Sequence, residues 1–515
     1  MPEITKTGAE PAFRVPSVVW VGLTALGVLA YFLGLNIPLV GPDEPRYAQV
    51  AREMFERGDW ITPTLGGSHW FEKPALLYWL EIAGFQLLGV TEFAARLGPA
   101  IFGLATVACL WFLGRSVEKS SSGRSTGLAA TLALISASTL GILVFAHGAS
   151  FDIIITFPIT AALVSFFVYD RSTTLHRNAA SGRSGLISLG SFYFFVGVAL
   201  LAKGLIGAVF PYAIVAFYFI LSRRMPTGRL LLSLAWGTML AALVAAVWYL
   251  PMYHRHGWEF IDEFIIQQHF QRFTSNKYQH PQPFYFYLWV LPLMTLPWLP
   301  LLAAAIWRYG KKPFQNVSTE AKVLKTVDSD LLRFAIAWLL VPLVFFSFSG
   351  SKLPGYILPA VPAAVILTAT FAHTLAAESR KWMTAILTTT FLVFAVTIGL
   401  IFTVVPRFAN ADSAKGLIEA AKAQGHSSER VFGLHTVSHS AEFYAAGSLL
   451  RDPDGKQKKL YGVGEIEPEM RRAGEHKALV LVPSEYARQL TDALFLHPTL
   501  IADNGDLSII AVSLE

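Results

Sequence analysis

The sequence predicts a polytopic α-helical membrane protein with a small C-terminal α/β domain. Of the 515 residues, 54% are hydrophobic and only 15% are charged, whereas soluble globular chains carry about 25% charged residues. The apolar residues also gather in uncharged runs of membrane-spanning length, such as 125–146 and 230–250. Because the chain has a single cysteine, Cys109, it cannot form an intramolecular disulfide. These observations exclude a soluble enzyme, a disordered chain and a disulfide-stapled secreted domain.

About eleven apolar segments are candidate transmembrane helices, since about 20 residues of helix cross the hydrocarbon core of a bilayer. The candidates are residues 18–38, 93–114, 125–146, 150–169, 185–202, 205–221, 230–250, 284–306, 331–349, 355–377 and 382–404. The first of them is followed by no small-residue cleavage site, so we expect it to remain as a span rather than to act as a signal peptide.

Lysine and arginine are distributed unequally between alternate loops. The short loops 115–124 and 223–229 are rich in these residues, and such loops lie on the cytoplasmic side of a membrane. With an odd number of spans, the N-terminus is expected in the cytoplasm and the C-terminus outside, in a bacterial periplasm. The net charge of +6 then reflects membrane topology, and we expect no nucleic-acid partner.

Residues 406–515 have abundant charge and no run of membrane length, in contrast to the transmembrane domain predicted for residues 1–405. Short apolar stretches alternate there with amphipathic ones, which predicts a small α/β domain on the outer face. The expected strands cover 431–437, 478–483 and 507–512, and the expected helices cover 411–424 and 484–495. We expect this domain to shape or cap the membrane region.

The first outer loop, residues 41–92, is the most informative segment. An amphipathic helix is expected to start with Asp43 as its N-cap and to stop at Gly58. A second apolar stretch, 75–90, is short and interrupted by Glu81, so it is expected to lie along the membrane interface. A site in this loop would sit at the level of lipid headgroups, where the phosphate of a lipid-linked substrate lies.

Acidic and basic residues follow one another closely in this loop, as Asp43-Glu44 and then Glu72-Lys73. A carboxylate there could take a proton from an acceptor or stabilise positive charge on the anomeric carbon of a sugar. A lysine and an arginine could hold a departing phosphate. The residue types alone leave open the alternative of a helix cap followed by solvated charges.

The order of residues in the loop resembles that of a known family. The loop contains the strings G-P-D-E-P-R-Y-A-Q-V-A-R-E-M-F-E-R-G-D-W-I-T-P, then W-F-E-K-P-A-L-L-Y-W and F-A-A-R-L. These resemble the first periplasmic loop of the bacterial aminoarabinose transferase and protein-mannosyltransferase-like family of GT-C membrane glycosyltransferases. Weaker similarities follow at Phe151-Asp152, Ala202-Lys203-Gly204, 268–273 and 351–359. All of them lie on the outer side of the topology inferred from charge alone.

The resemblance implies a GT-C fold and the inverting transfer of a sugar from a polyprenyl-phosphate donor outside the membrane. Within it, Asp43 resembles the essential acidic residue of the first loop, and Glu44 is its neighbour in the acidic pair. Tyr47 resembles a nearby site residue, and Asp152 resembles a second acidic residue at the next outer loop. No soluble nucleotide sugar is implied, because the donor arrives already activated.

The resemblance also implies a phosphate-binding set. Lys73 and Arg272 resemble the pair that holds the lipid phosphate, with Tyr356 and Lys352 as additional groups. Lys203 lies between two apolar segments, where it could bind substrate or only mark a re-entry turn.

Glu72 and His269 occupy positions where relatives have been associated with a divalent metal. A glutamate–histidine pair falls short of the three or four protein ligands of a usual zinc site, so no cofactor is expected to be required. His254, His256 and His280 are expected on the loop surface.

The donor implied by the resemblance is an undecaprenyl-phosphate sugar. The details of the motif favour 4-amino-4-deoxy-L-arabinose as the sugar, lipid A of lipopolysaccharide as the acceptor and the bacterial inner membrane as the location. Fewer spans are expected here than in that branch, which leaves a protein O-mannosyltransferase-like enzyme as a second interpretation. A lipid-linked sugar transporter or flippase is the alternative from another class. It is disfavoured because the charged motifs gather on one side of the membrane and show no paired halves.

Overall fold

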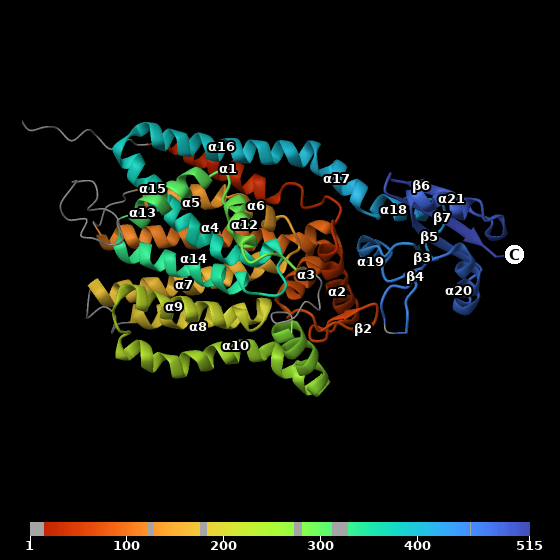
Figure 1. Ribbon diagram of the computed structural model, residues 1–515, viewed down its shortest axis with the longest axis horizontal. Helices are drawn as coiled ribbons and strands as arrows, with labels where there is room; N and C mark the ends of the chain where they lie inside the picture. Colours follow the sequence, from red (N-terminus) through yellow and green to blue (C-terminus); the bar gives the residue numbers. More distant parts are fainter. Residues whose placement is uncertain are drawn as a thin grey trace, which may run out of the picture.

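The computed structural model describes residues 15–121, 127–175, 183–271, 281–311, 328–453 and 455–514. The molecule is elongated, with a bundle of helices lying side by side along its long axis and a small domain with a β-sheet at one end (Figure 1). The chain therefore combines a helical membrane region with a small C-terminal α/β domain, as the sequence predicts.

Within the described ranges, seven helical stretches are long and apolar enough to cross a membrane. They are α4 (Glu92–Ser121), α7 (Phe151–Leu175), α8 (Arg183–Lys203), α10 (Gly228–Phe260) continued by the π-helix η2 (Ile261–Gln271), α14 (Ser329–Ser347), the 3-10 helix η4 (Pro354–Ala360) with α15 (Val361–Glu378), and α16 (Arg380–Thr403). Two shorter apolar helices, α1 (Ser17–Phe32) and α9 (Ile206–Ser222), match two more of the predicted segments.

The two remaining predicted segments are helix pairs with a bend. Helices α5 (Leu128–Ala137) and α6 (Leu140–Ala146) meet at 55°, and α12 (Phe286–Met294) and α13 (Leu299–Lys311) meet at 119°. The segment 284–306 is therefore not one straight helix. Pro297 lies in the break between its two parts, and a proline has no backbone N–H with which to continue a helix.

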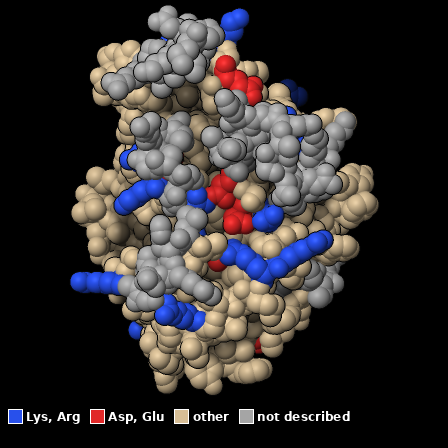
Figure 2. Space-filling model, turned by 90° about the vertical axis from the view of Figure 1, so that its left-hand side faces the viewer, with Lys and Arg blue, Asp and Glu red and all other residues tan. Residues whose placement is uncertain are grey.

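Arginine residues lie near the helix ends at the end of the bundle away from the sheet. Figure 2 views this end and shows Lys and Arg side chains around a smaller acidic group. Two of the arginines are paired there, Arg171 with Asp328 and Arg224 with Asp170. This distribution agrees with the predicted cytoplasmic side, but the orientation in a membrane stays a prediction.

The first outer loop forms α2 (Asp43–Arg57), a hairpin of β1 (Thr64–Leu65) and β2 (Ser68–His69), and α3 (Leu76–Leu88), all at the end beside the sheet (Figure 1). Gly58 ends α2 in the left-handed conformation with a φ of 64°, as predicted. The expectation that Asp43 is the N-cap is wrong, because Pro42 holds that position and Asp43 is the first helical residue. Its carboxylate still lies where the helix dipole favours negative charge.

The C-terminal domain contains a five-stranded sheet in the order β4-β3-β5-β7-β6, in which β3 is parallel to β4 and β5, and β7 is antiparallel to both of its neighbours. Its strands are β3 (Arg430–Leu434), β4 (Lys459–Leu460), β5 (Lys477–Pro483), β6 (Thr499–Asp503) and β7 (Leu507–Ser513). Its helices of five or more residues are α17 (Val405–Asp412), α18 (Lys415–Ala423), α19 (His439–Tyr444), α20 (Ile466–Ala473) and α21 (Ala487–Thr491). The three predicted strands are confirmed, whereas the helix expected over 411–424 is divided between α17 and α18. The helix expected over 484–495 is reduced to the short α21 between 3-10 turns.

The C-terminal domain contacts the first outer loop directly. The Tyr444 hydroxyl accepts a hydrogen bond from the Leu39 backbone N–H at 2.8 Å and donates one to the Glu92 carboxylate at 3.1 Å. The Lys415 ammonium forms an ion pair with the same carboxylate at 2.7 Å. The domain is thereby attached where α2 and α4 begin, although the domain boundary at residue 405 stays a prediction.

Candidate active site

The first turn of α2 carries an acidic residue, an arginine and a tyrosine that contact one another. The Asp43 carboxylate forms an ion pair with Arg46 at 2.5 Å, and the Arg46 guanidinium lies 5.6 Å from the centre of the Tyr47 ring. Burial and the negative charges of Glu72 and Asp43 raise the pKa of Tyr47 well above its usual value. The Tyr47 hydroxyl therefore keeps its proton near neutral pH and can donate a hydrogen bond.

The second acidic residue, Glu44, is held by a buried arginine. Arg96 donates to the Glu44 carboxylate at 2.7 Å from Nη2 and at 3.1 Å from Nε. The same carboxylate accepts hydrogen bonds from the backbone N–H groups of Ala149 at 2.8 Å and Val40 at 3.1 Å. With both oxygens occupied in this way, Glu44 connects the start of α2 to α4 and to the segment before α7.

Three predicted site residues from three elements meet at the outer end of the bundle. The Lys203 ammonium, at the end of α8, pairs with the Asp152 carboxylate at the start of α7 and lies 4.7 Å from the centre of the Tyr356 ring in η4. A Cβ atom on Gly355 would overlap the Asp152 carboxylate, so η4 can approach so closely only with glycine at that position. Lys203 thus contacts other candidate site residues.

Lys73 and Lys203 also line the same cavity, which has a volume of about 310 Å³. Lys73 follows the β1–β2 hairpin and forms an ion pair with its neighbour Glu72 at 2.8 Å. The rest of the wall is mainly apolar and comes from the end of the hairpin, η2, α9 and α14. The lining residues are Glu72, Lys73, Pro74, Lys203, Leu205, Ile206, Val209, Phe264, Gln268, Phe270, Phe345, Phe346, Ser349 and Tyr356. Two ammonium groups in an apolar wall suit an anionic headgroup that carries a long apolar chain.

Asp43 does not line this cavity, but it is linked to it through the side chains beside it. Glu72, which lines the cavity, acts electrostatically on both Arg46 and Tyr47. Because Asp43 lies in the same helical turn as Arg46 and Tyr47, it lies on the side of α2 that faces the charge of Glu72.

Lys352 does not line the cavity. Its ammonium donates to the backbone carbonyls of Ser349 at 2.6 Å and Gln282 at 3.0 Å, and burial lowers the pKa of this side chain. These bonds hold the loop that leads into η4, the element that carries Tyr356.

Two predicted site residues, His269 for a metal and Arg272 for the phosphate, lie in η2 and directly after it. Arg272 lies outside the described residues. His269 is a residue of η2, but its side chain also falls outside the described part of the chain. The pairing of Lys73 with Arg272 and of Glu72 with His269 therefore stays a prediction.

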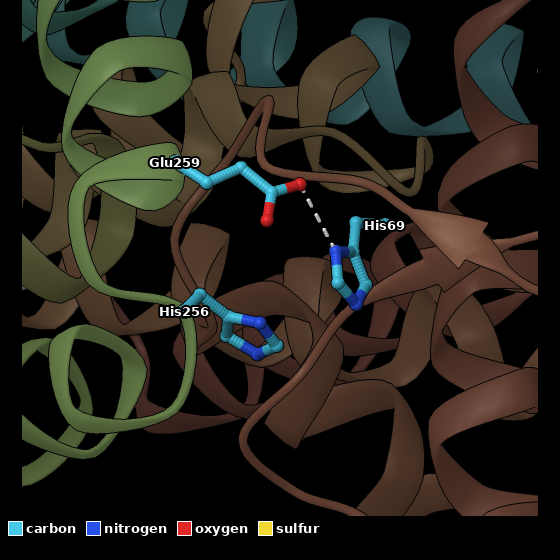
Figure 3. A group of neighbouring side chains, drawn as sticks. All are labelled: His69, His256 and Glu259. Atoms are coloured by element: carbon cyan, nitrogen blue, oxygen red, sulfur yellow. Dashed lines mark hydrogen bonds and ion pairs between the residues drawn. The ribbon is translucent and has the colours of Figure 1, made fainter.

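The sequence did not indicate two features of the structure, His439 near α2 and a group of His69, His256 and Glu259. His439, in α19 of the C-terminal domain, lies close enough to Arg46 and Asp43 for both charges to act on it, and burial with the Arg46 charge lowers its pKa. His69, His256 and Glu259 form a separate group outside the cavity, shown in Figure 3. His256 was expected on the loop surface, but it is partly buried in the last turns of α10. Both features depend on contacts between segments that are far apart in the chain, and no residue spacing in the sequence indicates such contacts.

Comparison with known proteins identifies relatives of this arrangement. Residues 23–263 match the family described as dolichyl-phosphate-mannose-protein mannosyltransferase. Two curated relatives are named undecaprenyl phosphate-alpha-4-amino-4-deoxy-L-arabinose arabinosyl transferase. The protein from Shewanella sediminis is 33% identical over 344 residues, which cover 66% of this chain and 57% of the relative. The protein from Aeromonas salmonicida is 33% identical over 356 residues, which cover 69% of this chain and 60% of the relative. The chain thus spans about three fifths of the length of these relatives.

Two solved structures share the fold over nearly the whole chain. The crystal structure of ArnT from Cupriavidus metallidurans bound to undecaprenyl phosphate has a TM-score of 0.74 and 21% identity, and the match covers 96% of this chain and 98% of that one. The apo state of the same protein has a TM-score of 0.70. The fold is that of the GT-C class of membrane proteins. The chain is similar to the aminoarabinose transferase and protein-mannosyltransferase-like proteins over the matched residues, which agrees with the resemblance seen in the first loop.

Proposed function

We propose that the chain is an inverting glycosyltransferase that uses a polyprenyl-phosphate-linked sugar as its donor. The observation that carries this proposal is the cavity of about 310 Å³ in which Lys73 and Lys203 project from an otherwise mainly apolar wall. The two ammonium groups would bind the donor phosphate, and the apolar wall from α9 and α14 would receive the prenyl chain. A soluble sugar phosphate would need no such wall.

In the proposed reaction, the bond between the anomeric carbon and the phosphate oxygen breaks while the acceptor oxygen forms a new bond on the opposite face. The electron pair of the broken bond goes to the phosphate, which leaves as polyprenyl phosphate. Lys73 and Lys203 stabilise the negative charge that develops there, which is the main electrostatic requirement of such a displacement. Asp152 keeps Lys203 in place through their ion pair.

Asp43 faces the acceptor side in this proposal. If the acceptor is a hydroxyl, the Asp43 carboxylate takes its proton as general base. If the acceptor is an ionised phosphate, no base is needed, and Asp43 balances positive charge at the anomeric carbon. Arg46 and Tyr47 would orient the sugar, whereas Glu44 positions the start of α2 through Arg96.

The identity of the donor and the acceptor is inferred from the relatives. Curated proteins at 33% identity are named as transferases of 4-amino-4-deoxy-L-arabinose from undecaprenyl phosphate, and the ArnT structure holds undecaprenyl phosphate. We therefore propose the same donor and, as the acceptor, lipid A at the periplasmic face of a bacterial inner membrane. The basic helix ends opposite the C-terminal domain support this orientation.

The proposal can be tested with the purified full-length chain in lipid nanodiscs. Release of undecaprenyl phosphate is measured from a panel of undecaprenyl-phosphate sugars, with lipid A or a peptide as the acceptor. We expect turnover with the aminoarabinose donor and lipid A, and a loss of at least 100-fold in Lys73→Ala and Asp43→Asn. Two variants of exposed residues in the C-terminal domain, Lys477→Ala and Asp506→Asn, serve as matched controls.

Each other outcome leads to a different conclusion. Turnover with a mannose donor and the peptide would identify a protein mannosyltransferase, which would replace the proposed sugar and acceptor. Movement of labelled donor between leaflets without any release of undecaprenyl phosphate would overturn the transferase and support a transporter.

A further inference from the structure

A group of two histidines and one glutamate lies outside the cavity of the candidate active site. His69 Nδ1 is 3.2 Å from a carboxylate oxygen of Glu259, and His256 lies beside both of them (Figure 3). One ligand atom from each of the three residues can be chosen so that all three lie within 4.8 Å of one another. None of the three residues has a part in the proposed transfer.

The backbone brings these residues together from two separate elements. His69 is the last residue of β2, and His256 and Glu259 lie on either side of Gly257 in α10. Gly257 has a φ of 55° and a ψ of −130°, which kinks the helix at that position. The kink lies between the two α10 residues that approach His69, and an L-residue with a side chain would be strained in this conformation.

The two imidazole rings are held by their neighbours. The His69 ring stacks on Phe71 with the ring centres 5.0 Å apart, and the His256 ring meets His69 edge-on at 4.6 Å. His256 Nε2 shares a hydrogen bond with the Thr62 hydroxyl at 2.9 Å. An oxygen partner on one ring nitrogen fixes the orientation of the ring and the tautomer, as is usual for histidines that bind metals.

We infer that His69, His256 and Glu259 form a binding site for a divalent metal ion of the zinc type. Two imidazoles and one carboxylate are a known ligand set for Zn²⁺, with a fourth position left for water. At zinc–ligand distances of about 2.0–2.1 Å, tetrahedral ligand atoms lie about 3.3 Å from each other. The observed separation of 3.2 Å between His69 and Glu259 already fits this value, and the limit of 4.8 Å leaves about 1.5 Å for side chains to close. His69 and Glu259 are 42% and 58% exposed, so they can adjust and a metal can reach them.

A metal bound at this site would connect two segments that border the cavity. It would link the β1–β2 hairpin, which Lys73 follows by four residues, to the end of α10. The π-helix η2 starts directly after α10 and supplies Phe264, Gln268 and Phe270 to the cavity wall. A metal at this site therefore fastens the lysine side of the cavity to its η2 wall. The site is distinct from the predicted pair Glu72 and His269.

Metal binding is tested directly on the full-length protein in nanodiscs. After treatment with a chelator, the protein is dialysed against Zn²⁺ and its metal content is measured. Binding of Co²⁺ is followed by its visible absorption, which reports a tetrahedral site with nitrogen and oxygen ligands. The variants are His69→Ala, His256→Ala and the isosteric Glu259→Gln. His254→Ala is the matched control, because it removes an exposed histidine from the same helix without touching the group.

We expect the wild type and His254→Ala to bind one equivalent of Zn²⁺ and to give the tetrahedral Co²⁺ spectrum. Each of the other three variants is expected to bind at least tenfold more weakly. Zn²⁺ should also raise the thermal unfolding midpoint of the wild type but not that of the three variants, because a ligand stabilises only a protein that binds it when folded. The midpoints of the metal-free proteins show whether a variant is folded.

Two results would overturn the inference. Absence of stoichiometric Zn²⁺ in the wild type would exclude the site, and equal binding by wild type and Glu259→Gln would place the metal elsewhere. Both measurements are independent of sugar transfer, so failure of the proposed function would leave them unaffected.

Discussion

Lys203 and Asp152 form an ion pair at the outer end of the bundle, although 51 positions separate them in the chain. Their side chains are only 14% and 16% exposed. The pair places a cation on the cavity wall and joins α7 to α8 where both helices leave the membrane region. Asp152 and Lys203 therefore contribute both to the contact between the two helices and to the proposed site.

The coupling between these two residues can be measured with a double-mutant cycle on Asp152→Ala and Lys203→Ala. We expect an interaction free energy of about 1–3 kcal/mol in unfolding experiments in detergent, because the two charges share a largely buried contact. The exposed pair Arg52–Glu56, in which the glutamate is 53% exposed, is the matched control and should show less than about 1 kcal/mol. Equal values for the two pairs would mean that the Asp152–Lys203 contact is solvated like a surface ion pair.

Breaking the Glu44–Arg96 pair should reduce stability strongly. Arg96 is 5% exposed and Glu44 is 12% exposed, so Glu44→Gln leaves a buried guanidinium without its counter-charge, at a cost of about 3–5 kcal/mol. Glu56→Gln, on the exposed face of the same helix, should change the free energy of unfolding by less than about 0.5 kcal/mol. If Glu44→Gln abolishes sugar transfer while the unfolding midpoint stays at the wild-type value, Glu44 acts on substrate rather than on the position of α2.

Much of this architecture could be predicted because it depends on local composition. Membrane-length apolar runs are visible in one dimension, and Gly58 marks the end of α2 because few other residues adopt a positive φ. The bend between α12 and α13 was not predicted, since the apolar run continues through Pro297 and hydropathy does not report direction. The strands β4 and β6 were also missed, because β4 has two residues and β6 at the sheet edge has no buried alternation.

The candidate site was predictable only in part, for a related reason. Asp43, Lys73 and Asp152 could be found from local motifs, but the partner of each side chain depends on packing between distant segments. Nothing near Asp152 in the sequence indicates Lys203, and nothing near His69 indicates the kink at Gly257. His439 comes close to α2 because the C-terminal domain attaches to the first loop, through contacts that include those of Tyr444 and Lys415.

Glu81 should make stability depend on pH. It is fully buried in α3, and neither carboxylate oxygen has a hydrogen-bond partner among the described residues. Burial, with a smaller contribution from the Glu44 charge, raises its pKa well above the usual value. Below a pH of about 4.5, the usual pKa of the side chain and the value taken for the unfolded state, Glu81 is protonated in both the folded and the unfolded protein. Its ionisation then does not change the free energy of unfolding. Above that pH, only the unfolded state ionises freely, so stability is lost as the pH rises toward the folded-state pKa.

The change that tests this effect is Glu81→Met, which keeps the size of the side chain and removes the titrating group. The free energy of unfolding of the variant relative to that of wild type should increase between pH 4 and pH 7, by up to about 1.4 kcal/mol for each pH unit of the titration window. Glu419→Gln, at a residue that is 63% exposed, is the control and should show little change in its difference from wild type. A difference for Glu81→Met that is the same at both pH values would show that Glu81 ionises normally in the folded protein.

Attachment of the C-terminal domain should depend on the Tyr444 hydroxyl. Tyr444→Phe removes the acceptor of the Leu39 N–H and the donor to Glu92. An unsatisfied buried donor costs about 1–3 kcal/mol, so the variant should expose the junction between α19 and the first loop to faster hydrogen exchange. Tyr461→Phe is the matched control in the same domain, because that side chain is 69% exposed.

Because the domain brings His439 close to Asp43, we expect Tyr444→Phe also to reduce sugar transfer several-fold, while Tyr461→Phe leaves it unchanged. Unchanged exchange at Leu39 in Tyr444→Phe would show that other contacts, such as the Lys415–Glu92 pair, are sufficient to hold the domain.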